Sequence, residues 1–286
     1  MLGALIIVFR EVIEAGIIVG IVLAVTRGVA RSRLWISVGL AGGVIGAGLV
    51  AAFAGAIADA LQGVGQELFN GSILAIAVVM LTWHNVWMAS HGRQMAAEMR
   101  QIGEEVKSGA RSLFALAVVV GVAVMREGSE IALFLYGLAA AGGSSAAGLL
   151  LGSALGLVAG CAVSALTFLG LVTIPQRYLF QVTTILITFL AAGLAAQSVL
   201  FFQQAGLVTA LSQTAWDTSG VLSDTSLFGR VLHTLVGYSD QPSVMQVVVY
   251  AATLAVIFTL SKVFAAPNGA RRGLAARPAA NGAHPA

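Results

Sequence analysis

Seven apolar segments of about twenty or more residues run through this chain, and they constrain its fold more than any other feature. A helix that crosses a bilayer needs about 20 mostly apolar residues. The predicted spans are residues 2–26, 35–57, 69–89, 113–141, 147–173, 178–203 and 244–265. Charged residues make up only 9% of the chain, against roughly 25% in soluble domains. The composition excludes a soluble enzyme, a nucleic-acid-binding protein and a disordered protein. It predicts an all-α, polytopic protein whose surface faces a lipid bilayer.

The first segment is expected to stay in the mature protein as a membrane helix. It begins MLGALIIVF, without a basic start, and it carries Arg10, Glu11 and Glu14 inside the apolar run. A cleavable signal peptide has the opposite arrangement, with basic residues before an uninterrupted apolar stretch. The three charged residues therefore lie at membrane depth in the predicted protein.

Basic residues in the links between the spans predict the orientation in the membrane. The first, third and fifth links and the C-terminal segment are basic, whereas the second, fourth and sixth are neutral or acidic. The basic positions are Arg27, Arg31, Arg33, Arg93, Arg100, Lys107, Arg111, Arg177, Lys262, Arg271, Arg272 and Arg277. The positive-inside rule then places the N-terminus outside the cell membrane and the C-terminus in the cytoplasm. Residues 1–265 form the predicted membrane domain, and residues 266–286 a disordered basic tail.

The third link, residues 90–112, has helical character of its own. Met95, Met99, Ile102 and Val106 recur at helical spacing, with charged residues between them. Such a pattern is typical of an amphipathic helix, and we expect this one at the cytoplasmic interface.

An internal repeat relates the first and fourth spans. The segment REVIE begins at Arg10, and REGSE begins at Arg126. Spans 2 and 5 occupy matching places, and both carry glycines at four-residue spacing, which lets helix backbones approach closely. Because each copy has three spans, the second must enter the membrane from the opposite side. We therefore expect an inverted 3+3 repeat, about residues 1–89 and 113–203, plus a seventh helix at 244–265.

The repeated segments carry the chemistry. Each places two carboxylates three residues apart on one helix face, with an arginine four residues before the second carboxylate. The residues are Glu11 and Glu14 with Arg10, and Glu127 and Glu130 with Arg126. Ionised side chains at this depth cost on the order of 2.5–3.5 kcal/mol each. If the two helices face each other, the formal charge is −2, which a multivalent cation would balance. Carboxylates are hard ligands suited to iron, manganese, magnesium or calcium.

Three other interpretations use the same residues. In the first, the protein is a permease of this fold for another metal such as lead or manganese. In the second, it is a structural or sensory membrane protein whose Glu–Arg pairs only bridge helices. An intramembrane enzyme with paired carboxylates as acid and base is the third. No second catalytic constellation in the sequence supports an enzyme.

The paired Arg-Glu-x-x-Glu segments in spans 1 and 4 resemble the oxidase-dependent iron permease family of fungi and bacteria. Residues 216–219 (WDTS), the glycines and Tyr238 that follow, and residues 83–93 also look like its bacterial members. The resemblance covers roughly residues 1–265. One position departs from the family, which has glycine after the first glutamate of each motif. Val12 stands there in span 1, and we expect its bulk to narrow the pocket beside Glu11.

The resemblance implies that the four glutamates bind iron in transit, supported by the two arginines. Iron is then a transported substrate, with no permanently bound cofactor. It further implies uptake into the cytoplasm, with a separate ferroxidase or periplasmic iron-delivery protein as partner. Three further residues are candidates for the path or its entrance: His84 deep in span 3, His91 near its cytoplasmic end, and Asp217 on the outer link.

Overall fold

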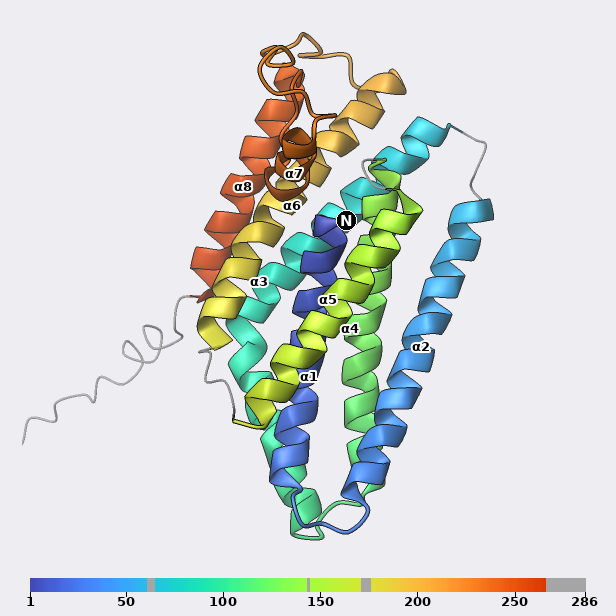
Figure 1. Cartoon of the computed structure of the whole chain (residues 1–286), viewed down its shortest axis with the longest axis vertical. Coiled ribbons are helices and arrows are strands. Elements are labelled where there is room, and N and C mark those ends of the chain that lie inside the picture. Colours follow the sequence, from blue (N-terminus) through green and yellow to red (C-terminus); the bar gives the residue numbers. More distant parts are fainter. Residues whose placement is uncertain (61–64, 143–144, 171–175, 266–286) are drawn as a thin grey trace, which may run out of the picture.

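The computed structural model describes residues 1–60, 65–142, 145–170 and 176–265, and in this part of the chain regular structure is helical (Figure 1). Seven long helices and the short α7 follow one another along the chain. Their bounds are α1 (Leu2–Val25), α2 (Ser32–Ala60), α3 (Gln66–Lys107), α4 (Phe114–Ala140), α5 (Ala146–Phe168), α6 (Gln176–Gln204), α7 (Leu227–Val236) and α8 (Val244–Ala265). The predicted all-α class is confirmed.

Five of the described helices are long and apolar enough to cross a membrane by length and composition, namely α2, α3, α5, α6 and α8. Helices α1 and α4 are 24 and 27 residues long, and each includes three charged residues. Their charged residues separate α1 and α4 from the five apolar helices, and these charged residues are the repeated Arg-Glu segments. The protein is a multi-pass membrane protein in which α1 and α4 carry charged residues in the middle of their length.

The long helices begin and end within a few residues of the predicted spans. The main difference concerns α3, which continues without a break through the segment expected to form a separate interfacial helix. Met99 and Val106 on this extension pack against α1, α2 and α4, and this packing holds the extension in line with the span. Residues 171–173 of the fifth predicted span and the tail 266–286 lie outside the described residues.

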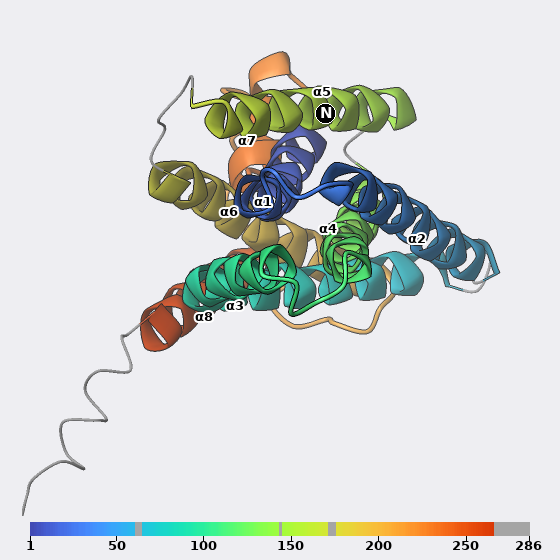
Figure 2. The same cartoon turned by 90° about the horizontal axis from the view of Figure 1, so that it is seen from below.

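Helix packing follows a paired pattern that Figure 2 shows from below. The most extensive contacts join α1 to α5, α2 to α4, and α3 to α6. Glycine rows make the first two contacts close. A Cβ on Gly156 of α5 would lie 2.6 Å from the backbone oxygen of Leu5 in α1, and one on Gly43 of α2 would lie 2.7 Å from the oxygen of Gly121 in α4. Only glycine permits these helices to approach so closely.

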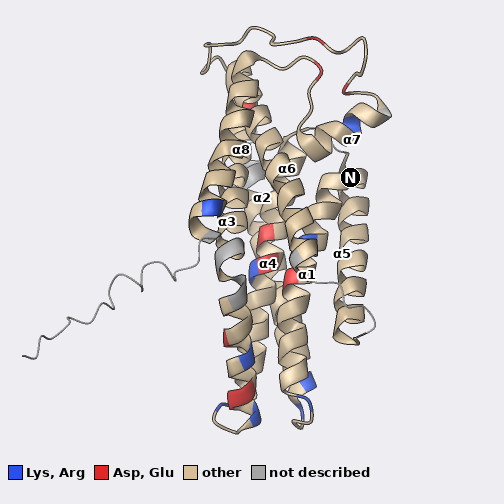
Figure 3. Cartoon of the chain, turned by 90° about the vertical axis from the view of Figure 1, so that its left-hand side faces the viewer, with Lys and Arg blue, Asp and Glu red and all other residues tan. Residues whose placement is uncertain are grey.

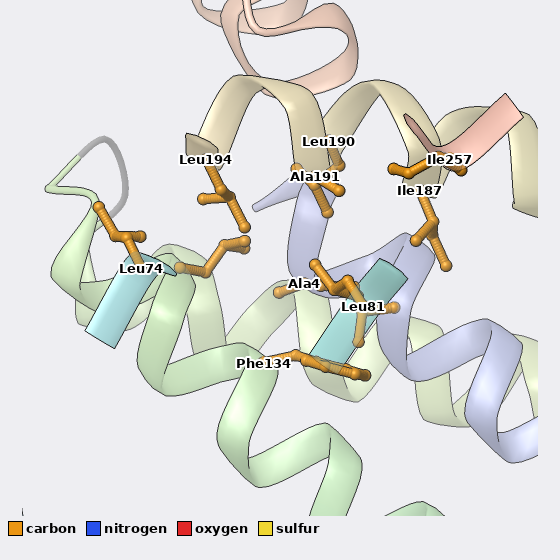
Figure 4. Close-up of a cluster of buried hydrophobic side chains, with 11 residues drawn as sticks. Ala4, Leu74, Leu81, Phe134, Ile187, Leu190, Ala191, Leu194 and Ile257 are labelled. Carbon is orange, nitrogen blue, oxygen red and sulfur yellow. The ribbon is translucent and has the colours of Figure 1, made fainter. Parts of the chain in front are cut away.

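Two apolar clusters lie above and below the charged segments. The first joins α1, α3, α4, α6 and α8 and includes Ala4, Leu81 and Phe134 (Figure 4). The second joins the other ends of α1 and α4 to α2 and α3, and includes Val22 and Val120. The glutamates and arginines fall between them, and Figure 3 shows these charges at mid-height, apart from those at the two ends. The site is therefore enclosed by packed hydrocarbon at both ends.

Candidate metal site

Three helices meet around the charged segments. Helices α1, α3 and α4 all contact one another, and α1 and α4 present their carboxylates where they meet. Glu11 and Glu14 project from one turn of α1, and Glu127 and Glu130 from one turn of α4, because residues three apart share a helix face. The third helix contributes His84. The predicted convergence of the two acid pairs is observed.

Each arginine binds the second glutamate of its own segment. The Nε of Arg10 donates a hydrogen bond of 2.9 Å to Oε1 of Glu14, and the Nε of Arg126 donates one of 3.1 Å to Oε1 of Glu130. Both pairs span four residues of one helix. The first is fully buried, whereas the Arg126 side chain is 34% exposed. Two of the four carboxylates are thus neutralised within their own helices.

Glu11 and Glu127 have no such partner. Glu11 is completely buried and Glu127 is 2% exposed. All four of their carboxylate oxygens are buried, and none has a hydrogen-bond partner among the described residues. A buried charge without a partner is strongly unfavourable, so these two groups are the least satisfied in the site.

His84 lies between the two acid pairs. Its Nε2 is 3.6 Å from a carboxylate oxygen of Glu11 and 3.6 Å from one of Glu14. Its Nδ1 contacts Glu130 on the opposite helix. The imidazole is 3% exposed and packs edge-on against the ring of Phe134. One side chain therefore contacts carboxylates from both α1 and α4.

Four of these residues lie close enough together that they could hold a single metal ion. One ligand atom from each of Glu11, His84, Glu127 and Glu130 lies within 4.8 Å of the others. Carboxylate oxygens and an imidazole nitrogen together suit iron, manganese or zinc better than calcium or magnesium, which take oxygen ligands. Glu14 lies beside this group, near His84 and bound to Arg10.

Two other predicted path residues lie outside the cluster. His91 lies about two turns from His84 along α3 and stacks on Trp87 with ring centroids 5.1 Å apart. The guanidinium of Arg126 lies over the same Trp87 ring, 4.3 Å from its centroid. Asp217 is on the exposed link between α6 and α7, where it accepts hydrogen bonds from the backbone and hydroxyl of Ser219.

These bonds from Ser219 lower the pKa of Asp217, because they stabilise its charged form. Asp217 closes a local turn and does not cap one of the described helices.

Val12 is directed toward α5. Its Cγ1 would lie 2.8 Å from a Cβ built on Gly160, so the valine occupies the space that this glycine leaves. The matching residue of α4, Gly128, faces Ala47 of α2 instead. A glycine on the neighbouring helix therefore accommodates the bulk of Val12. This contact is with α5, and it does not show the narrowed pocket beside Glu11 that we expected from the sequence.

Two further contacts of α3 support the site. The interhelical hydrogen bond of Asn85 is what a polar residue deep in an apolar span predicts, whereas the contacts of Trp87 were not predicted. The amide nitrogen of Asn85 donates a hydrogen bond of 3.0 Å to the hydroxyl of Thr188 on α6, which anchors α3 directly beside His84. Trp87 stands between Arg126 and His91. The signal for the first was the adjacent His84–Asn85 pair deep in an apolar span. The second had no signal beyond an aromatic residue one turn away.

The whole length of the membrane domain matches a known family. Residues 1–271 fit the model of the iron permease FTR1 family. The chain belongs to this family. Among curated proteins, the ferrous iron permease EfeU of Escherichia coli O157:H7 is 34% identical over 250 residues, covering 86% of this chain and 89% of the relative. EfeU of Shigella flexneri is 37% identical over 186 residues, covering 65% and 78%. The solved structures include no match to this chain.

Family membership establishes the general activity. The family and these relatives are permeases, so the protein is a transporter of iron and not an enzyme. The long apolar helices agree with a protein that resides in a membrane. The resemblance drawn from the paired Arg-Glu-x-x-Glu segments is thereby confirmed at the level of the family.

Proposed function

We propose that this permease imports ferrous iron into the cytoplasm through the cluster formed by Glu11, Glu14, His84, Glu127 and Glu130. The observation that carries the proposal is the pair of buried carboxylates, Glu11 and Glu127, that have no described hydrogen-bond partner beside a buried imidazole. These groups are costly to hold in a membrane unless something compensates them. A transported cation is the compensation that the site's chemistry favours.

The charge of the cluster favours a divalent ion. Glu14 and Glu130 are balanced by Arg10 and Arg126, which leaves a formal charge of −2 when the remaining two carboxylates are ionised and His84 is neutral. A divalent ion balances that charge, whereas a trivalent ion leaves an excess positive charge in a low-dielectric site.

The donor set points the same way. An imidazole nitrogen is a softer donor than a carboxylate, and it therefore suits Fe²⁺ better than the harder Fe³⁺. The curated relatives are named ferrous iron permeases, which supports the same oxidation state here.

The proposed topology is an inverted repeat of two three-helix units, α1–α3 and α4–α6, followed by α7 and α8. The paired packing supports it, because α1 contacts α5 as α4 contacts α2, and both contacts use glycine rows. The two Arg–Glu hydrogen bonds are also equivalent. A shared site between inverted units is the arrangement of many secondary transporters.

The proposed orientation follows the charges at the two ends. Arg27, Arg31 and Arg33 join α1 to α2 at the end where α3 finishes, and the positive-inside rule places this end in the cytoplasm. The segment between α6 and α8, which includes Asp217, Asp224 and Asp240, then faces outward (Figure 3). Its exposed residues include Trp216 and Val221, which offer an apolar surface to a separate ferroxidase or iron-delivery protein.

The site is closed in this conformation. Glu11, Glu14, His84 and Glu127 are each no more than 3% exposed, and apolar clusters lie at both ends. Iron therefore enters and leaves through rearrangement of α1, α3 and α4 relative to one another, as expected where two repeats alternate access to a central site.

Uptake of radioactive iron into proteoliposomes tests the proposal. Ferrous iron, kept reduced with ascorbate, and ferric citrate are offered separately to the wild type and to single variants of the four glutamates to Gln. We expect uptake of the ferrous form, and a loss of at least tenfold in each variant, because each removes a charged ligand or its partner. His84→Leu, which removes the nitrogen donor, gives a similar loss.

Glu67→Gln is the matched control, because Glu67 is an exposed glutamate at the start of α3, away from the cluster. Its uptake stays at the wild-type level. Normal ferrous uptake by all four cluster variants, at normal protein levels in the vesicles, would refute the site. Preferential uptake of ferric citrate would refute the assigned oxidation state while leaving the site intact.

A further inference from the structure

The turn between α1 and α2 is tightly organised. The hydroxyl of Thr26 donates a 2.7 Å hydrogen bond to the backbone oxygen of Val22. The hydroxyl of Ser32 donates a 3.3 Å hydrogen bond to the backbone oxygen of Thr26. Both hydroxyl residues are buried. Gly28 and Arg31 have positive φ values of 91° and 64°. Arg31 is one of two described non-glycine residues in that region, so the turn holds it in a conformation that L-residues rarely adopt.

Three arginines project from this turn. Arg27, Arg31 and Arg33 are all exposed, and none forms an ion pair with a described residue. Another arginine at the same end of the molecule behaves differently, since Arg111 binds Glu105 at 2.6 Å. The turn is thus a concentration of positive charge for which the chain supplies no described counter-charge.

An open cavity begins at these arginines and continues between the helices. Because α1 packs mainly on α5 and α2 on α4, the two consecutive helices make little contact with each other. The space between them is a cavity of about 710 Å³. All three arginines line it at one end. The remainder is lined mostly by apolar side chains, namely Val19, Leu23, Ile36, Leu40 and Phe168, with Ser37 among them.

We propose that this cavity binds one anionic phospholipid, with its phosphate among the three arginines and part of an acyl chain between α1 and α2. Guanidinium groups form charge-assisted hydrogen bonds to phosphate oxygens. Basic pockets between membrane helices at the cytoplasmic side are suited to anionic headgroups. The apolar wall favours a lipid over free phosphate, because a soluble anion leaves that wall uncovered. The inference needs only a membrane setting and does not depend on the iron site.

Native mass spectrometry of the full-length protein in detergent tests the lipid site, with phosphatidylglycerol and phosphatidylcholine titrated separately. The main variant combines Arg27→Gln, Arg31→Gly and Arg33→Gln. Glycine replaces Arg31 because it tolerates the positive φ and so preserves the turn. At about 1 kcal/mol per arginine, the triple variant weakens phosphatidylglycerol binding on the order of 100-fold. We expect phosphatidylcholine to bind the wild type at least tenfold more weakly than phosphatidylglycerol does.

Two further variants separate the site from general surface attraction. Arg111→Gln removes one charge from the same end of the molecule and leaves lipid binding unchanged. Arg33→Gln alone weakens binding about fivefold, and it serves as the test if the triple variant fails to fold. Equal binding by wild type and Arg33→Gln, or an equal loss in Arg111→Gln, would overturn the proposal. Displacement of the lipid by millimolar glycerol phosphate would show a soluble-anion site instead.

Discussion

Replacing Glu127 with methionine should stabilise the protein in the absence of metal while abolishing iron uptake. Glu127 is buried, and both its carboxylate oxygens lack a described hydrogen-bond partner. Methionine is unbranched, similar in length and free of polar groups, so it fills the same space. The matched substitution is Glu14→Met. It removes the hydrogen-bonded partner of Arg10, a guanidinium that is itself only 2% exposed.

The two substitutions have opposite energetic consequences. Removing a buried polar group that has no partner recovers its desolvation penalty, about 1–3 kcal/mol. Removing one member of a buried ion pair leaves the other charge uncompensated, which costs about 3–5 kcal/mol. The predicted difference between the variants is therefore about 4–8 kcal/mol, summed from these ranges. At ~2 °C per kcal/mol for a chain of this size, their melting temperatures differ by about 10 °C.

Thermal unfolding of the purified proteins in one detergent, with chelator present, measures this difference. Glu127→Met melts above the wild type and Glu14→Met below it, although neither transports ferrous iron. The combination would show that Glu127 is retained for function at the expense of stability. If Glu127→Met instead melts as low as Glu14→Met, then Glu127 has a stabilising partner in the protein, and the argument from an uncompensated carboxylate is wrong.

Two further predictions concern other parts of the fold. Gly156→Val should prevent folding of the helix bundle or lower its melting temperature sharply, because a Cβ at this position would lie 2.6 Å from the backbone oxygen of Leu5. Gly42→Val is the control, because a Cβ there meets nothing within 4 Å. Size-exclusion chromatography and thermal unfolding should show the control to be folded and as stable as the wild type. Bonds from Ser219 hold the pKa of Asp217 below its usual value, so the turn that they form is stable at neutral pH and is lost as the pH falls through that lowered pKa. Exchange of the Ser219 amide should therefore be protected at pH 7, and Asp217→Asn should weaken this protection; equal protection in both proteins would contradict the assigned bond.

Much of the fold could be predicted because a membrane simplifies the rules. A chain in lipid must satisfy its backbone internally, so an apolar run of about 20 residues is almost obliged to be a helix. Helix boundaries such as Leu2–Val25 and Val244–Ala265 accordingly fall close to the predicted ones. The extension of α3 through residue 107 was not predicted. An amphipathic pattern indicates a helix, but it does not say whether the helix lies in the interface or continues a span.

The site was predicted in part for a related reason. The Glu-x-x-Glu spacing places Glu11 beside Glu14 on any helix, and the four-residue separation from Arg10 allows the observed hydrogen bond. The contribution of His84 is of a different kind. A single histidine in an apolar span has no partner along its own helix, and the sequence does not state which face of α3 turns toward α1 and α4.

The amino-acid sequence by itself determined the membrane class, the long helices, the two charged segments and, through their resemblance, the family. Each of these depends on residues close together in the chain, where helical geometry alone relates one side chain to the next. Only the tertiary structure decided that the buried carboxylates of Glu11 and Glu127 have no hydrogen-bond partner among the described residues. It also decided that His84 joins carboxylates of both helices, and that α1 and α2 diverge around a basic cavity. Those features arise where helices distant in sequence pack together, and the packing depends on the shapes of all the surfaces that meet.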